Sequence, residues 1–138
     1  MKASIVTLFA LVVVLAIAGP AVAQDGVLSA YIPFNFNIGD STLPSGIYTV
    51  QTVGNGALLL IRSVENRKAM YSWANTNFTP STNLKVGKLV FNGYGDRYFL
   101  SSVAWPFGGP SRDLPPSNVE LQASKESAKR KLEVASTK

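Results

Sequence analysis

The chain has 138 residues, with 13 Lys and Arg against 8 Asp and Glu, and it contains neither His nor Cys. The lack of Cys excludes disulfides, and the lack of His removes the commonest general base and the commonest metal ligand. The basic surplus is spread along the chain and is not clustered with aromatics, so we expect no nucleic-acid binding.

The first 23 residues have the pattern of a secretory signal peptide. Met1-Lys2 gives a positive start, residues 3–18 are almost wholly apolar, and Gly19-Pro20 precedes the small residues of Ala21-Val22-Ala23. We therefore predict cleavage after Ala23 and export to the periplasm or the extracellular space. A membrane anchor is the alternative, but a spanning helix needs roughly 20 apolar residues. No membrane span is expected after cleavage.

Residues 24–116 are predicted to form one antiparallel β domain. Apolar and polar residues alternate over residues 28–38, as in a half-buried strand, and Pro33 places this strand at an edge or bends it. Residues 46–53 and 57–63 flank the turn signal Gly54-Asn55-Gly56, which predicts a hairpin. The apolar run at the start of the second arm is typical of a central strand covered on both faces.

The second half of this domain holds another predicted strand and a second hairpin. Residues 69–74 predict a strand with Ala69, Tyr71 and Trp73 on one face. Residues 88–105 place two β-rich runs around a Gly-Tyr-Gly-Asp turn, which predicts the hairpin around which the domain is organised. Leu89 and Phe91 are predicted to share one face of its first arm. Phe99, Val103 and Trp105 are predicted to share one face of its second arm. Residues 75–85 and 106–116 are expected to be loops.

A capping box over residues 117–120 predicts a C-terminal helix. With Ser117 as N-cap, the helix is expected to run to about Val134 within a segment, residues 117–138, that frays at its end. Glu126 and Arg130, and Lys129 and Glu133, would pair four residues apart. The predicted fold class is mainly β: a small antiparallel barrel or sandwich of about six or seven strands with one C-terminal α-helix.

Five motifs occur together in one order along this chain. They are Ile32-Pro33-Phe34-Asn35-Phe36 followed by Gly39, Leu43-Pro44-Ser45-Gly46-Ile47-Tyr48-Thr49-Val50, Gly87-Lys88-Leu89-Val90-Phe91, Tyr94-Gly95-Asp96-Arg97-Tyr98-Phe99-Leu100 and Leu114-Pro115-Pro116-Ser117-Asn118-Val119-Glu120. The set resembles a family of small uncharacterised bacterial exported β-rich proteins and covers nearly all of the chain up to about Glu120. The resemblance implies a signal peptide and a compact β domain, and it implies no activity or site residue.

The turn of the 88–105 hairpin carries the most suggestive polar pair, Asp96-Arg97. In a functional interpretation, Arg97 holds a carboxylate or phosphate group and Asp96 orients it. In a structural interpretation, Asp96 closes the turn and Arg97 begins the next strand with its stem over the sheet. The structural interpretation is favoured, because a Gly-Asp sequence is turn chemistry in its own right.

The aromatic residues offer a second candidate site. Tyr31, Tyr71, Trp73, Tyr94, Tyr98 and Trp105 could stack against a sugar or another small ligand, but a domain of this size also needs large side chains to fill its core. Core packing is favoured, with Tyr31 and Tyr94 as the members expected to be exposed. The residues proposed as ligand contacts are Arg97, Asp96, Tyr94, Tyr31 and Trp73.

These observations predict a non-enzymatic exported structural or binding module with no cofactor and no metal. The alternative is a β-barrel that binds a small ligand or carbohydrate through exposed aromatics. A carboxylate-based hydrolase is a further alternative; it would need two acids about 5 to 10 Å apart, drawn from Asp40, Glu65, Asp96 and Asp113. The basic C-terminal tail could also contact an anionic surface weakly.

Overall fold

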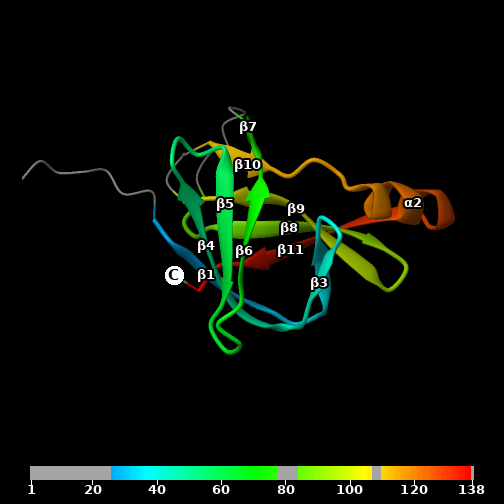
Figure 1. Cartoon of the computed structure of the whole chain (residues 1–138), viewed down its shortest axis with the longest axis horizontal. Coiled ribbons are helices and arrows are strands. Elements are labelled where there is room, and N and C mark those ends of the chain that lie inside the picture. The colour runs from blue at the N-terminus through cyan, green and yellow to red at the C-terminus, as the bar shows by residue number, and fades with distance from the viewer. Residues whose placement is uncertain (1–25, 78–83, 107–109, 138) are drawn as a thin grey trace, which may run out of the picture.

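The computed structural model describes residues 26–77, 84–106 and 110–137. Two β-sheets pack face to face, and the one helix of the described residues lies beyond one end of the sheets (Figure 1). The predicted signal peptide and its cleavage site after Ala23 lie outside the described residues.

The first sheet has four antiparallel strands in the order β1-β4-β5-β6. Their bounds are β1 (Leu28–Ile32), β4 (Gly46–Val53), β5 (Leu58–Ser63) and β6 (Ala69–Trp73). The predicted hairpin of β4 and β5 is confirmed, and β5 is central, between β4 and β6. β1 lies at the sheet edge, and the chain leaves the strand before Pro33, so the predicted effect of this proline is also confirmed.

The second sheet has the order β11-β8-β9-β10-β7. Its strands are β7 (Asn75–Asn77), β8 (Lys88–Tyr94), β9 (Arg97–Ala104), β10 (Ser111–Asp113) and β11 (Lys129–Ala135). A short hairpin, β2 (Phe36–Ile38) and β3 (Ser41–Leu43), joins this sheet through a parallel bridge between Asn37 and Phe99.

The fold class is confirmed as mainly β, sandwich-like, with antiparallel sheets that do not close into a barrel and with one helix near the C-terminus. The described residues form eleven strands, more than expected. The predicted first strand divides into β1 and β2 around Pro33. The segments expected to be loops carry the short strands β7 and β10.

The core lies between the two sheets. Side chains that point inward from the first sheet include Tyr48, Val50 and Ile61, and they meet Phe36 and Phe91 from the second. The Phe36 ring packs edge-on against Tyr48 and Phe91, with centroids 5.0 and 5.5 Å away. Burial of such large apolar side chains is the main source of stability in a chain without disulfides.

The predicted β8–β9 hairpin is confirmed, with Gly95 at positive φ in a two-residue turn. One predicted face is wrong: Phe99 does not share the core of Val103. A register shift between Val90 and Phe91 leaves Ser101 without an opposite residue and so reverses the alternation along β9. Leu100 and Val103 therefore enter the main core, while Phe99 packs beneath the helix.

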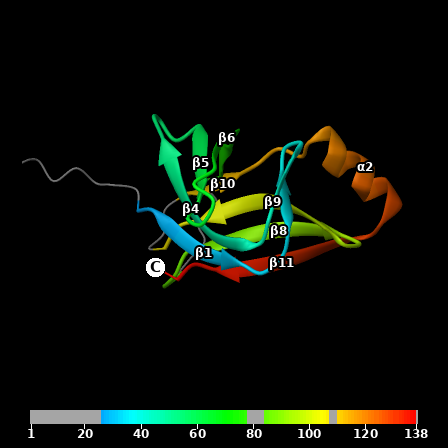
Figure 2. The same ribbon diagram turned by 60° about the horizontal axis from the view of Figure 1, so that its bottom comes forward.

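The C-terminal prediction is right at its start and wrong at its end. The helix α2 (Asn118–Glu126) begins after Ser117, whose side-chain oxygen accepts a hydrogen bond from the Glu120 N–H over 3.1 Å. The chain then turns back as β11, which pairs with the whole of β8 (Figure 2). Leu132 and Val134 alternate with exposed residues, a strand period, and pack against the core. The predicted helical ion pairs are therefore absent from the described residues.

Glu133 instead forms an ion pair with Lys88 across the β8–β11 ladder, with Nζ and Oε1 3.1 Å apart. The final residues join the two sheets, because the Thr137 N–H donates to the Ser29 carbonyl over 2.7 Å. Within the described parts of the chain, no helix has the length and apolar character needed to cross a membrane.

Candidate functional site

The outward face of the first sheet carries four of the eight exposed large apolar side chains of the described residues. Because side chains alternate along each strand, residues between the core positions of β1, β4 and β6 point to solvent. Tyr31 is 55 % exposed, Tyr71 62 % and Trp73 69 %, and Ile47 is also exposed. An apolar surface of this kind is typical of a binding face.

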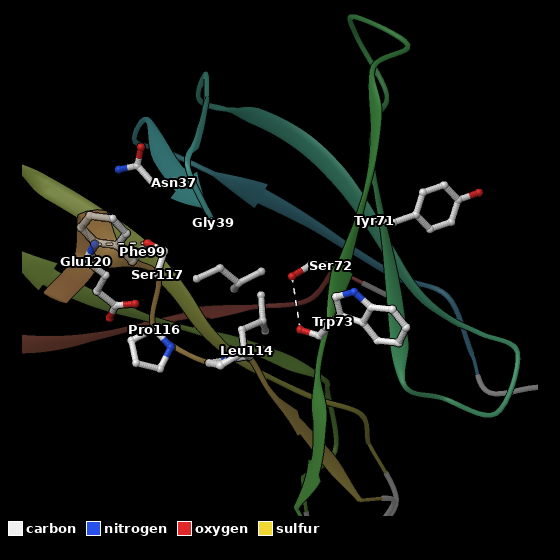
Figure 3. Close-up of a pocket in the computed structure, with 12 residues that line it drawn as sticks. Asn37, Gly39, Tyr71, Ser72, Trp73, Phe99, Leu114, Pro116, Ser117 and Glu120 are labelled. Atoms are coloured by element: carbon white, nitrogen blue, oxygen red, sulfur yellow. Dashed lines mark hydrogen bonds between the residues drawn. The ribbon is translucent and has the colours of Figure 1, made fainter.

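Tyr71 and Trp73 are the two most exposed side chains of this face. They are two residues apart on β6, and their register partners on β5 are Leu60 and Leu58. Leu60 is almost fully buried although it faces outward, so its neighbours on this face cover it. Figure 3 shows both rings on the same side of β6. We refer to Leu58, Leu60, Tyr71 and Trp73 as the aromatic patch.

Tyr31 is exposed as predicted, but it does not join the aromatic patch. It lies on β1, opposite Ile47, at the other edge of the sheet from β6. A row containing Thr49, Arg62 and Ala69 crosses the sheet between the two regions. The predicted contacts Tyr31 and Trp73 are therefore on one face but far apart along and across it.

A groove of about 310 Å³ runs on the other side of β6. Ser72 points into it, whereas Tyr71 and Trp73 turn their rings away (Figure 3). The opposite wall is formed by β9, the β2–β3 hairpin, the segment that leads into α2 and the first turn of α2. Its lining residues there include Asn37, Leu100, Leu114, Pro115, Pro116 and Glu120.

Glu120 is a buried carboxylate at the end of this groove. Its side chain is only 5 % exposed, and its Oε1 accepts a hydrogen bond from Asn92 Nδ2 over 2.9 Å and lies 3.4 Å from the Tyr94 hydroxyl. The sequence predicts Glu120 as half of a capping box. The Ser117 half is present, but the carboxylate reaches across to β8.

Tyr94, proposed as an exposed ligand contact, is buried beneath α2 with Phe99, Val119 and Ala123. The predicted exposure is therefore wrong, because α2 covers this end of the hairpin. Burial raises the pKa of the Tyr94 hydroxyl above its ordinary value of 10.0, and the charge of Glu120 and its hydrogen bond raise the pKa further.

Asp96 and Arg97 occupy the places that the structural interpretation gives them. Asp96 is exposed in the β8–β9 turn, and Arg97 begins β9. The Arg97 guanidinium carbon lies 5.7 Å from the centroid of the Phe99 ring, a cation–π contact. The turn is also held by Arg130 of β11, whose Nη2 donates to the Gly95 carbonyl.

The four acids considered for a hydrolase lie on different elements. Asp40 is in the β2–β3 turn, Glu65 follows β5, Asp96 is in the β8–β9 turn, and Asp113 ends β10. Asp113 Oδ2 accepts a hydrogen bond from Asn77 Nδ2 over 2.9 Å. Among the residues that the structure describes, no group of three or more His, Cys, Asp or Glu side chains could hold a metal ion.

Comparison with protein-family models, with curated proteins and with solved structures finds no match to this chain. The family resemblance therefore stays a prediction.

The sequence could have predicted the exposure of Tyr71 but not the contact that Glu120 makes. Tyr71 has the same strand parity as Trp73, so the exposure of one side chain implies that of the other. Glu120 lies three residues after an N-cap, but its partner Asn92 is 28 residues away in the chain. Local patterns do not show a contact of this range.

Proposed function

We propose that the chain is an exported binding module that holds a polysaccharide against the aromatic patch. The observation that carries this proposal is the exposure of Trp73 and Tyr71, 69 % and 62 %, on one face of one strand. Export is supported by the signal-peptide pattern of the first 23 residues.

The chemistry of the aromatic patch suits sugar rings. An aromatic ring offers a flat apolar surface to the C–H groups of a pyranose, and the Tyr hydroxyl and the Trp N–H can bond its hydroxyls. Residues two apart in a strand are about 7 Å apart, so Tyr71 and Trp73 can contact successive parts of one saccharide chain. Leu58 and Leu60 fix the floor beneath the two rings by pairing opposite them.

A binding role is favoured over catalysis by the placement of the acids. Asp40, Glu65, Asp96 and Asp113 are on separate elements, and none of them belongs to the aromatic patch. Glycoside hydrolysis requires two carboxyl groups about 5 to 10 Å apart on either side of the scissile bond.

The proposal is tested by binding of the full chain to insoluble cellulose and chitin and to soluble amylose. We expect Trp73→Ala and Tyr71→Ala each to weaken binding about tenfold. This corresponds to the loss of roughly 1.4 kcal/mol of binding free energy for one aromatic contact. Tyr31→Ala is the matched control, because Tyr31 is also an exposed tyrosine of this sheet but lies at its other edge. It should bind like the wild type.

Tryptophan fluorescence gives a second readout. Trp105 is buried and its Nε1 donates to the Gly26 carbonyl over 2.5 Å, so a saccharide on the patch should shift the emission of Trp73 alone. If none of the three polysaccharides binds and Trp73→Ala instead converts a dimer to a monomer in sedimentation, the aromatic patch is a protein interface and the proposal is wrong.

A further inference from the structure

The groove beside β6 borders an open strand edge. Ala74 N–H donates to the Ala57 carbonyl and Ser63 N–H donates to the Lys68 carbonyl. In this register, the even-numbered residues of β6 direct their backbone N–H and C=O groups toward β5. In an antiparallel pair the residues between them point their amides and carbonyls away from the partner strand. Tyr71 and Trp73 are these residues, and with their rings turned away they border the groove through their backbone.

Three of the four backbone groups of Tyr71 and Trp73 have no bonding partner within the described ranges. The exception is the Trp73 carbonyl, which accepts a hydrogen bond from Ser72 Oγ over 3.3 Å. Soluble proteins usually protect such an edge with charges, a proline or a bulge. β6 has the sequence Ala-Met-Tyr-Ser-Trp and none of these features, whereas β11, at the edge of the second sheet, exposes Lys129, Arg130 and Lys131.

The groove has walls on both sides of the open edge. The segment with Leu114, Pro115 and Pro116 stands opposite β6, and Leu100 of β9 lines the space between them. The groove is walled on both sides and holds only about 310 Å³. This space suits one extended segment better than the sheet of a second copy, so the geometry favours a peptide.

Glu120 sets the charge that the occupant should carry. It is the one carboxylate among the described residues that line the groove, and no cationic side chain lines it. Asn92 Nδ2 and the Tyr94 hydroxyl both donate to Oε1 of this carboxylate, so its hydrogen bonds from the fold converge on one oxygen. A carboxylate on a side chain that is only 5 % exposed, with no cationic side chain among the described lining residues, favours a cationic donor, because the charge is then paired.

We propose that this groove binds an extended peptide segment of another protein as an added strand on β6, with a Lys or Arg side chain of the peptide on Glu120. The backbone groups of Tyr71 and Trp73 supply the ladder hydrogen bonds, as in other cases of β-strand addition. Leu100, Leu114 and Pro115 accommodate the apolar side chains of the peptide.

The test uses the full chain and a displayed library of random heptapeptides. We expect enrichment of β-prone peptides with one basic residue, and about tenfold weaker binding of the selected peptide to Glu120→Gln, since a charge-assisted hydrogen bond is replaced by a neutral one. Glu126→Gln is the matched control, because Glu126 is on the same helix, is exposed and does not line the groove. N-methylation of alternate peptide amides should also abolish binding.

The proposal is overturned if the library yields no enriched peptide, or if the enriched peptides lack a basic residue. It is also overturned if the selected peptide binds Glu120→Gln as tightly as the wild type, or if the chain self-associates and Glu120→Gln does not change this. This site and the proposed polysaccharide site fail independently. Trp73→Ala removes an outward ring but keeps the β6 backbone, so it should lose polysaccharide and keep the peptide. Glu120→Gln should show the reverse, with far-UV circular dichroism confirming that both variants are folded.

Discussion

Gly56 lies directly against the guanidinium group of Arg112: a Cβ at position 56 would come 2.5 Å from Arg112 Nη2 and 3.0 Å from Cζ. Gly56 is in the β4–β5 turn with φ of +87°, and Arg112 is buried on β10 with Nη1 donating to Thr76 Oγ1. The turn of the first sheet and a strand of the second therefore meet at a position where an added side chain would displace the buried Arg112 guanidinium from its place beside Thr76.

We predict that Gly56→Ala lowers the free energy of unfolding by about 2 to 4 kcal/mol, the sum of a left-handed alanine and an overpacked contact. Gly54→Ala is the matched control. Gly54 has φ of +65°, but a Cβ added there would have no neighbouring atom within 4 Å, so its variant should lose only about 1 to 2 kcal/mol. Urea unfolding of the two variants measures the difference, and equal losses would show that the Arg112 contact costs nothing.

Glu120 should stabilise the fold through its contact with Asn92. Glu120→Ala removes the acceptor of a buried amide and is expected to cost about 1 to 3 kcal/mol of unfolding free energy. Glu120→Gln keeps an acceptor oxygen and should cost clearly less. Glu126→Ala, at an exposed position of the same helix, should change stability by less than about 0.5 kcal/mol. A loss for Glu126→Ala as large as for Glu120→Ala would show that helix propensity alone explains the effect.

Two buried tyrosines should make the protein less stable at high pH. Burial raises the pKa of Tyr94 and of Tyr48 above 10.0, with Glu120 and Glu65 adding to the respective shifts and a hydrogen bond with Ser63 opposing that of Tyr48. Well below pH 10.0 both hydroxyls are protonated in the folded and the unfolded chain, so their contribution to stability is complete. Above this pH the unfolded tyrosines ionise first, and the free energy of unfolding falls until the pH passes the folded pKa values.

The measurement is urea unfolding at pH values from about 8 to 11. The wild type should lose stability with rising pH over the upper part of this range, and the double variant Tyr48→Phe/Tyr94→Phe should lose less. The two proteins should have equal slopes below about pH 9, where neither state ionises. Equal slopes above pH 10.0 would mean that other groups cause the alkaline loss.

Local patterns in the sequence predict the elements whose contacts are near in the chain. The β4–β5 and β8–β9 hairpins follow from their turn residues, and the start of α2 follows from Ser117. These patterns do not predict which strand pairs with the other edge of each hairpin. Nothing near Arg112 in the sequence indicates β7 or the turn at Gly56, because these contacts depend on how the two sheets meet.

The candidate sites show the same limit. Alternation places Tyr71 and Trp73 on one face of β6, but it cannot say which face meets the core, and composition alone favours core packing for both rings. Tyr94 sits in a turn region that is usually exposed, and it is buried because α2, which follows 24 residues later, covers it. Helix or strand propensity also does not separate the two states of residues 129–135, where the unpaired edge of β8 decides the outcome.

Deletion of residues 129–138 tests the role of β11. β11 pairs with β8 from Tyr94 to Lys88, and it places Leu132 and Val134 against the core. We predict that the shortened chain loses several kcal/mol of unfolding free energy and self-associates through the uncovered edge of β8. Thermal unfolding and size-exclusion chromatography would show both effects.

Two single substitutions test whether residues 129–135 form a docked strand or a fraying helix, without changing the length of the chain. Leu132→Ala removes a half-buried side chain from the core and should cost about 1 to 2 kcal/mol. Lys131→Ala alters the neighbouring exposed residue and should change stability by less than about 0.5 kcal/mol. If the shortened chain and Leu132→Ala are both as stable as the wild type, β11 contributes nothing to the fold, since a docked strand cannot be removed without cost when its apolar residues reach the core.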